Sequence, residues 1–245
     1  MHVADAPYFE AVQAELDRYP VVLYEGVKPE EFSNEDFQKS FTEKGGDAAQ
    51  LQRDLTGWFG FQYQLDAIDY TRKNFVHADM SMADFLAAGG GKFIPQVGEN
   101  AEVPTAPSVD DDTDTPTEAP AKTGGGLGAD VRSTWEKDKA IGDAVLGRPG
   151  PMRSMARTMF AKTRGTTDIG RALEMQPGFS ELILIKRNEV VIERLNEVLP
   201  EATGPIAIFY GAAHMDDLQE RLEAMGYKRT GARWLRAWAI RPPLR

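Results

Sequence analysis

Short apolar runs beside amphipathic segments limit this chain to few folds. The run at residues 21–24 follows a segment, residues 6–18, whose apolar side chains recur at helical spacing. The run at residues 205–210 is followed by a second helical segment, residues 215–225. A helix leading into a short buried strand is half of a βαβ unit, in which the strands are parallel. The sequence therefore predicts an α/β fold with a central mixed, mostly parallel sheet flanked by helices.

The rest of the chain supplies further elements and one break in composition. Residues 96–129 are acidic and rich in proline and glycine, and they contain no aromatic residue. Because such a segment buries too little apolar surface to offset its ordering entropy, we expect a disordered insertion inside one domain spanning residues 1–245. Periodicity predicts additional helices at 47–58, 82–86 (capped by Ser81), 130–146, 151–162 and 180–199, and strands at 75–77 and 234–240.

Composition excludes several kinds of chemistry. The chain of 245 residues has 38 acidic and 28 basic residues, which argues against nucleic acid or an anionic membrane as its main partner. It has no cysteine, which excludes disulfides, thiolate catalysis and cysteine metal sites. Any metal must be held by histidine, carboxylate or carbonyl oxygen, which favours Zn, Mn, Mg or Fe.

The ends of the sequence bear on its location. No run approaches the roughly 18 apolar residues of a membrane helix, and no signal peptide is visible, so the sequence as written predicts a cytoplasmic protein. Met1 stands directly before His2, where the βαβ pattern requires an earlier strand. We therefore expect a longer gene product, and an upstream signal segment would place the protein outside the cytoplasm.

Polar residues follow the predicted strands. The turn Gly211-Ala212-Ala213-His214 connects the second apolar run to its helix, and Glu25 follows the first run. His2 would follow the expected earlier strand. Since open α/β sheets carry their chemistry at the carboxyl ends of strands, we expect these three side chains to meet. Two imidazoles and a carboxylate fit a catalytic metal site with an open position for water.

One predicted helix places polar residues on its apolar face. At about 100° per residue, Asn188 falls inside the apolar stripe of residues 180–199 and Arg187 on its edge. Polar side chains that face a core need partners. We expect Arg187 to hold a carboxylate, either of a substrate or of Glu25. Asn188 is better explained as a structural hydrogen bonder than as a catalyst.

These residues resemble the motifs of the TraB/PrgY/GumN family, which is related to the TIKI metalloproteases. The early GxxH motif corresponds to Met1-His2-Val3-Ala4-Asp5, and the glutamate to Glu25 in Leu23-Tyr24-Glu25-Gly26-Val27. The helical arginine corresponds to Arg187, and the late GxxH motif ends at His214. The resemblance implies a fold akin to the erythromycin esterase and ChaN-like group. It also implies hydrolysis of a peptide or other amide, dependent on a divalent metal ion (Mn, Zn or Co).

Under this hypothesis each residue has a role. His2 and His214 would ligate the metal, and Glu25 would be the third ligand or the general base. Arg187 would stabilise developing negative charge or orient Glu25. Two other hypotheses remain open: a metal-independent esterase or amidase with histidine as the base, and a non-catalytic peptide-binding or signalling protein.

A few residues are weaker candidates. His77 and Asp79 would share one side of an extended strand, although a surface histidine near a helix cap is the simpler interpretation. The aromatic cluster at residues 58–61 is expected in the core. Three arginines in an otherwise acidic protein are expected to form a solvated face: Arg153, Arg157 and Arg164.

Overall fold

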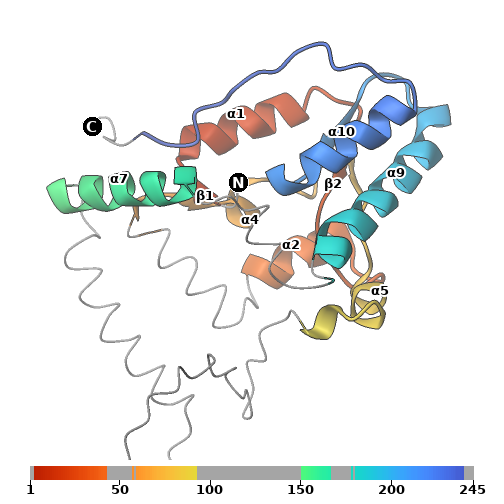
Figure 1. Ribbon diagram of the computed structural model, residues 1–245, viewed down its shortest axis with the longest axis horizontal. Helices are drawn as coiled ribbons and strands as arrows, with labels where there is room; N and C mark the ends of the chain where they lie inside the picture. The colour runs from red at the N-terminus through yellow and green to blue at the C-terminus, as the bar shows by residue number, and fades with distance from the viewer. Residues whose placement is uncertain are drawn as a thin grey trace, which may run out of the picture.

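The computed structural model describes residues 3–42, 57, 59–92, 150–166, 178 and 180–239. His2, the insertion predicted at 96–129 and the helix predicted at 130–146 lie outside these residues, as does almost all of the helix predicted at 47–58. The described part combines helices with two small sheets, which confirms the α/β class (Figure 1).

A parallel sheet of three strands forms the centre. Its order is β4 (Phe75–His77), β2 (Val21–Tyr24) and β5 (Ile206–Phe209). A separate antiparallel pair joins β1 (Val3–Ala4) to β3 (Gln62–Tyr63). The predicted strands at 21–24, 75–77 and 205–210 are thus confirmed, and their pairing is parallel.

The register of the parallel sheet determines which residues meet at its edge. Tyr24 lies beside His77 on one side and Phe209 on the other. Parallel strands end at the same edge, so the residues after these three positions are neighbours, although they are far apart in sequence.

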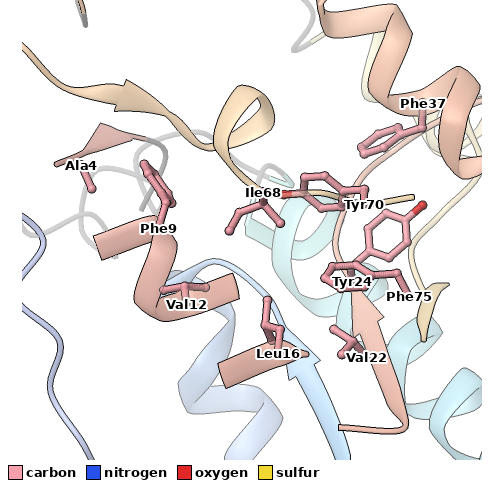
Figure 2. Packing of buried hydrophobic residues seen from close by; sticks show 10 residues of the cluster. All are labelled: Ala4, Phe9, Val12, Leu16, Val22, Tyr24, Phe37, Ile68, Tyr70 and Phe75. Carbon is pink, nitrogen blue, oxygen red and sulfur yellow. The ribbon is translucent and has the colours of Figure 1, made fainter. Parts of the chain in front are cut away.

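Helices cover both faces of β2. Successive side chains of a strand point to opposite faces. Val22 and Tyr24 accordingly pack in a cluster with α1 (Ala6–Leu16), as Figure 2 shows, whereas Leu23 packs in another cluster with the two helices of the opposite face. Those helices are α9 (Lys186–Val198) and α10 (Met215–Ala224). This burial on both faces explains why the run at 21–24 is wholly apolar.

Further helices complete the described fold. Ser81 caps one of them, because its hydroxyl accepts a hydrogen bond of 3.0 Å from the backbone N–H of Asp84, as predicted. No described helix is long and apolar enough to cross a membrane. The remaining α-helices are α2 (Asn34–Thr42), α4 (Gln64–Ala67), α5 (Met82–Ala87) and α7 (Pro151–Thr166).

The helix predicted at 180–199 is present, but its first part is wound differently. Glu181–Ile185 forms a π-helical turn that leads directly into α9. Such turns insert a residue into a helix and are frequent at functional sites. Arg187 and Asn188 are both buried just after this turn, as the stripe predicted.

The strand predicted at 234–240 is wrong for its described part. Residues 227–239 carry no helix or strand. This segment is held through Asp5, whose backbone N–H donates to the Ala237 carbonyl (2.8 Å) and whose carboxylate accepts from the Ala239 N–H (2.8 Å). The neighbouring β1 has only two residues and pairs with β3. One of the two bonds to Asp5 is made by its side chain, so the segment lies beside β1 without a continuous backbone ladder.

The expectation of a solvated arginine face is wrong for Arg157. Its side chain is 2% exposed and contacts the Asp5 carboxylate at 2.5 Å. It also donates to the carbonyls of Phe59 and Ala239 (both 3.0 Å) and lies over the Phe61 ring, 4.4 Å from its centre. Burial is tolerated because the guanidinium donors find acceptors. The buried Phe61 also places that part of the predicted aromatic cluster in the core.

Candidate functional site

Three residues of the candidate site follow the carboxyl ends of the parallel strands. Glu25 follows β2, Asp79 follows β4 and Gly211 follows β5. The Glu25 N–H donates to the Phe209 carbonyl (3.1 Å), so the backbone pairing continues past the strands. The sheet itself therefore brings these distant positions to one edge.

Arg187 reaches this edge from α9 and joins two carboxylates. Its Nε and Nη2 donate to the two oxygens of Asp79 at 2.9 and 2.5 Å, and Nη2 also donates to Glu25 Oε1 at 2.9 Å. The Asp79 side chain is fully buried. Burial by itself lowers the pKa of Arg187, but the hydrogen bonds and charges of Asp79, together with the charge of Glu25, raise it above its ordinary value. Arg187 is therefore held in its charged form between the two carboxylates.

Glu25 lies between Arg187 and the turn before α10. Its Oε2 accepts a 2.6 Å hydrogen bond from the Gly211 N–H, and its Oε1 lies 3.5 Å from Nε2 of His214. Burial tends to raise the pKa of Glu25, but the contact with His214, the charge of Arg187 and the Gly211 N–H outweigh it and bring the pKa to about 2. The side chain is ionised and still 22% exposed, so one side of it remains accessible.

The close approach of Glu25 explains why a glycine stands at position 211 of the late motif. A Cβ at Gly211 would lie 3.2 Å from Glu25 Oε2 and 3.8 Å from Cδ2 of His214. The carboxylate can approach the backbone at this turn closely because no side chain intervenes.

Asn188 fixes the orientation and the tautomer of His214. The Asn188 Nδ2 donates to the His214 carbonyl (3.2 Å) and to Asp217 Oδ2 (2.8 Å), so its Oδ1 is the atom that faces His214 Nδ1 at 2.7 Å. An amide oxygen only accepts, and Nδ1 must therefore carry hydrogen. In neutral His214 the Nε2 lone pair consequently faces Glu25.

His77 lies apart from this cluster. Its Nε2 lies 2.6 Å from the Gly26 carbonyl, and burial, the largest influence, lowers its pKa. Asp79 instead accepts from the backbone N–H groups of Gly26 (2.7 Å) and Met80 (2.8 Å). His77 and Asp79 therefore contact different backbone groups of Gly26. His77 is half-buried and holds the backbone just after Glu25.

Three predicted site residues form one connected network with two of the weaker candidates, Asn188 and Asp79: they are Glu25, Arg187 and His214. Sequence reasoning missed Tyr210, whose hydroxyl donates to the Ala78 carbonyl and whose ring packs edge-on against His214. It also missed Asp217. Asp217 could have been found from the sequence. The buried amide of Asn188 needs an acceptor, and a carboxylate three residues after His214 is close enough to provide one.

The described residues supply part of the predicted metal site. Within them, no three histidine or carboxylate side chains are grouped to hold a metal ion, and His2 lies outside them. Two donors nevertheless fit. His214 Nε2 and Glu25 Oε1 are 3.5 Å apart. Two ligand atoms with bonds of about 2.1 Å to one tetrahedral ion are separated by roughly 3.4 Å.

Comparison of the chain with protein-family models, with curated proteins and with solved structures finds no match. The resemblance to the TraB/PrgY/GumN family therefore stays a prediction from four short motifs. The chemistry of the site has to be argued from its geometry.

Proposed function

We propose that the cluster around Glu25 and His214 belongs to a divalent-metal hydrolase that cleaves peptide or other amide bonds, on a fold of the erythromycin esterase and ChaN-like kind. One observation carries the proposal. His214 Nε2 and the ionised Glu25 Oε1 are held 3.5 Å apart, and in the neutral imidazole that Nε2 carries a lone pair, because the hydrogen is on Nδ1. Two electron-pair donors placed side by side repel each other unless a cation lies between them or one takes a proton.

The residues divide the work as follows. His214 and Glu25 provide two ligands, and His2 is the proposed third. Asn188 accepts from Nδ1 of His214, which in the neutral imidazole leaves Nε2 as the ligating atom, and such partners of ligating histidines typically tune metal affinity. Arg187 holds Glu25 and presents positive charge near the oxygen on which negative charge develops. A bound divalent ion supplies acidification of a water molecule and polarisation of the amide carbonyl.

Metal binding by the 245-residue chain tests the proposal. Isothermal titration with Zn²⁺ and Mn²⁺ after chelation should show one saturable site, and His214→Ala and Glu25→Gln should each weaken it by about tenfold or more. The matched control is Glu189→Gln, which removes one negative charge from an exposed side chain of α9. Equal affinity in His214→Ala and wild type would refute the ligand assignment.

A second candidate function, a metal-independent amidase or esterase, is favoured by the same fixed tautomer. An imidazole with Nδ1–H bound to an amide oxygen presents Nε2 as a general base. Hydrolysis of a peptide or ester panel separates the two functions. Activity that survives exhaustive chelation supports the histidine base. Binding of peptides without hydrolysis, retained in the Glu25→Gln/His214→Ala double variant, supports the non-catalytic peptide-binding hypothesis.

A further inference from the structure

The charges in the cluster do not cancel. Two carboxylates, Asp79 and Glu25, meet the single guanidinium of Arg187. The sharing is unequal, because Asp79 takes contacts from both Nε and Nη2 whereas Glu25 takes one from Nη2 alone. Bidentate pairing of this kind is the stronger of the two arrangements. Asp79 is thus the main partner of Arg187.

Asp79 is held rigidly in this role. Its side chain is fully buried, and its two oxygens also accept the backbone N–H groups of Gly26 and Met80. These contacts come from the segments after β2 and β4, while Arg187 comes from α9. A carboxylate fixed from three sides cannot move toward solvent and leave Arg187 to Glu25.

We propose that Asp79 is a positioning residue that occupies Arg187 and thereby leaves the Glu25–His214 pair with one uncompensated negative charge for a divalent cation. This inference rests on the proposed function, since it concerns affinity at the same site. Without Asp79, the whole fork of Arg187 is available to Glu25. Arg187 then neutralises the charge of the Glu25 carboxylate and draws this carboxylate away from His214 Nε2.

Charge balance makes a prediction that a merely structural role does not. A histidine must be neutral to bind a metal, so in the metal-binding form the side chains of Asp79, Arg187, Glu25 and His214 have a formal charge of −1. Asp79→Asn raises this charge to zero, and adding Arg187→Gln returns it to −1. Adding Arg187→Gln should therefore restore part of the Zn²⁺ affinity that Asp79→Asn removes. If Asp79 only supported the fold, removing Arg187 as well would add a second defect.

The experiment is Zn²⁺ titration calorimetry on the full chain, with folding checked by circular dichroism and thermal melting. Asp79→Asn should weaken Zn²⁺ binding by about tenfold or more, the usual effect of losing a partner behind the ligands. The double variant Asp79→Asn/Arg187→Gln should bind Zn²⁺ more tightly than Asp79→Asn. Glu189→Gln is the control for loss of one negative charge outside the cluster.

The outcomes distinguish failure of the proposed metal site from failure of the proposed role of Asp79. A wild-type chain that does not bind Zn²⁺ overturns the metal site and this inference together. A wild type that binds, with a folded double variant no tighter than Asp79→Asn, overturns the role of Asp79 alone. Should Asp79→Asn not fold, Arg187→Gln decides. Its cluster carries −2 and must bind Zn²⁺ at least as tightly as wild type, and weaker binding overturns the inference.

Discussion

At the scale of single residues, the site is defined by which atoms can donate hydrogen. Asn188 has two acceptors beside its Nδ2, and this leaves its Oδ1 for Nδ1 of His214. The buried amide thus does two things at once. It satisfies the carbonyl at the start of α10, and it decides which imidazole nitrogen faces Glu25.

Asn188→Ala should remove the hydrogen bond that selects the tautomer of His214. The variant leaves Nδ1 and the carbonyl of His214 without their buried partner, which costs about 1–3 kcal/mol of folding free energy. Urea denaturation measures that loss, and ¹⁵N chemical shifts of the His214 ring should change from the Nδ1–H form to a mixture of tautomers. Asn196→Ala, at an exposed position of the same helix, should change neither. An unaltered tautomer in Asn188→Ala would contradict the assignment.

Glu25 makes the stability of the chain depend on pH. Folding lowers its pKa from the ordinary 4.5 to about 2. The ionised side chain therefore stabilises the folded state fully above about pH 4.5, and this contribution disappears as pH falls toward 2. Integrated over the shift, it amounts to roughly 3 kcal/mol.

The Glu25→Gln variant measures that contribution. Its unfolding free energy, followed with urea in chelator, should fall less than that of wild type between pH 5 and pH 2. Glu197→Gln, an exposed residue paired with Arg194, should follow the wild-type curve and serves as the control. Parallel curves for wild type and Glu25→Gln would contradict the depressed pKa.

At the scale of elements, the strands and the main helix of the site were predictable and their partners were not. The run at 21–24 is apolar throughout because both faces of β2 are covered, and Arg187 and Asn188 broke the stripe of α9 because each is buried with a partner. Asp79 could not be assigned to Arg187, 108 positions away, because local periodicity says nothing about long-range pairing. The π-helical turn before α9 was missed for a related reason: a single inserted residue hardly alters the apolar pattern.

The junction of β5 and α10 offers a test at this scale. Gly211→Ala places a Cβ 3.2 Å from Glu25 Oε2, while the backbone there, at φ −60°, suits any residue. The carboxylate must shift and its hydrogen bond to the position 211 N–H must lengthen, so we expect a loss of about 1 kcal/mol of stability and weaker Zn²⁺ binding. Gly231→Ala, with nothing near its added methyl, is the control. Unchanged Zn²⁺ affinity would show that the close approach at Gly211 is dispensable.

At the scale of the whole molecule, Asp5 and Arg157 connect three parts of the chain. Asp5 lies between β1 and α1, Arg157 on α7, and Ala239 in the C-terminal segment that runs past α1 (Figure 1). No local pattern indicated this connection, because an arginine among other arginines suggests a solvated surface. Its burial depends on acceptors from distant segments, which only the folded chain brings together.

Removing Arg157 should loosen all three parts together. Arg157→Ala leaves the Asp5 carboxylate without its buried counter-ion, and breaking such a pair typically costs about 3–5 kcal/mol. Urea denaturation should show this loss, and trypsin should cut the segment at residues 227–239 sooner, because the carbonyl of Ala239 loses its donor. Met155→Ala, an exposed position on α7, should leave both readouts at wild-type values. If Arg157→Ala matches this control, the C-terminal segment is held by the packing of Leu235 and Ala237 against the α1 cluster, and the buried ion pair is not what fixes it.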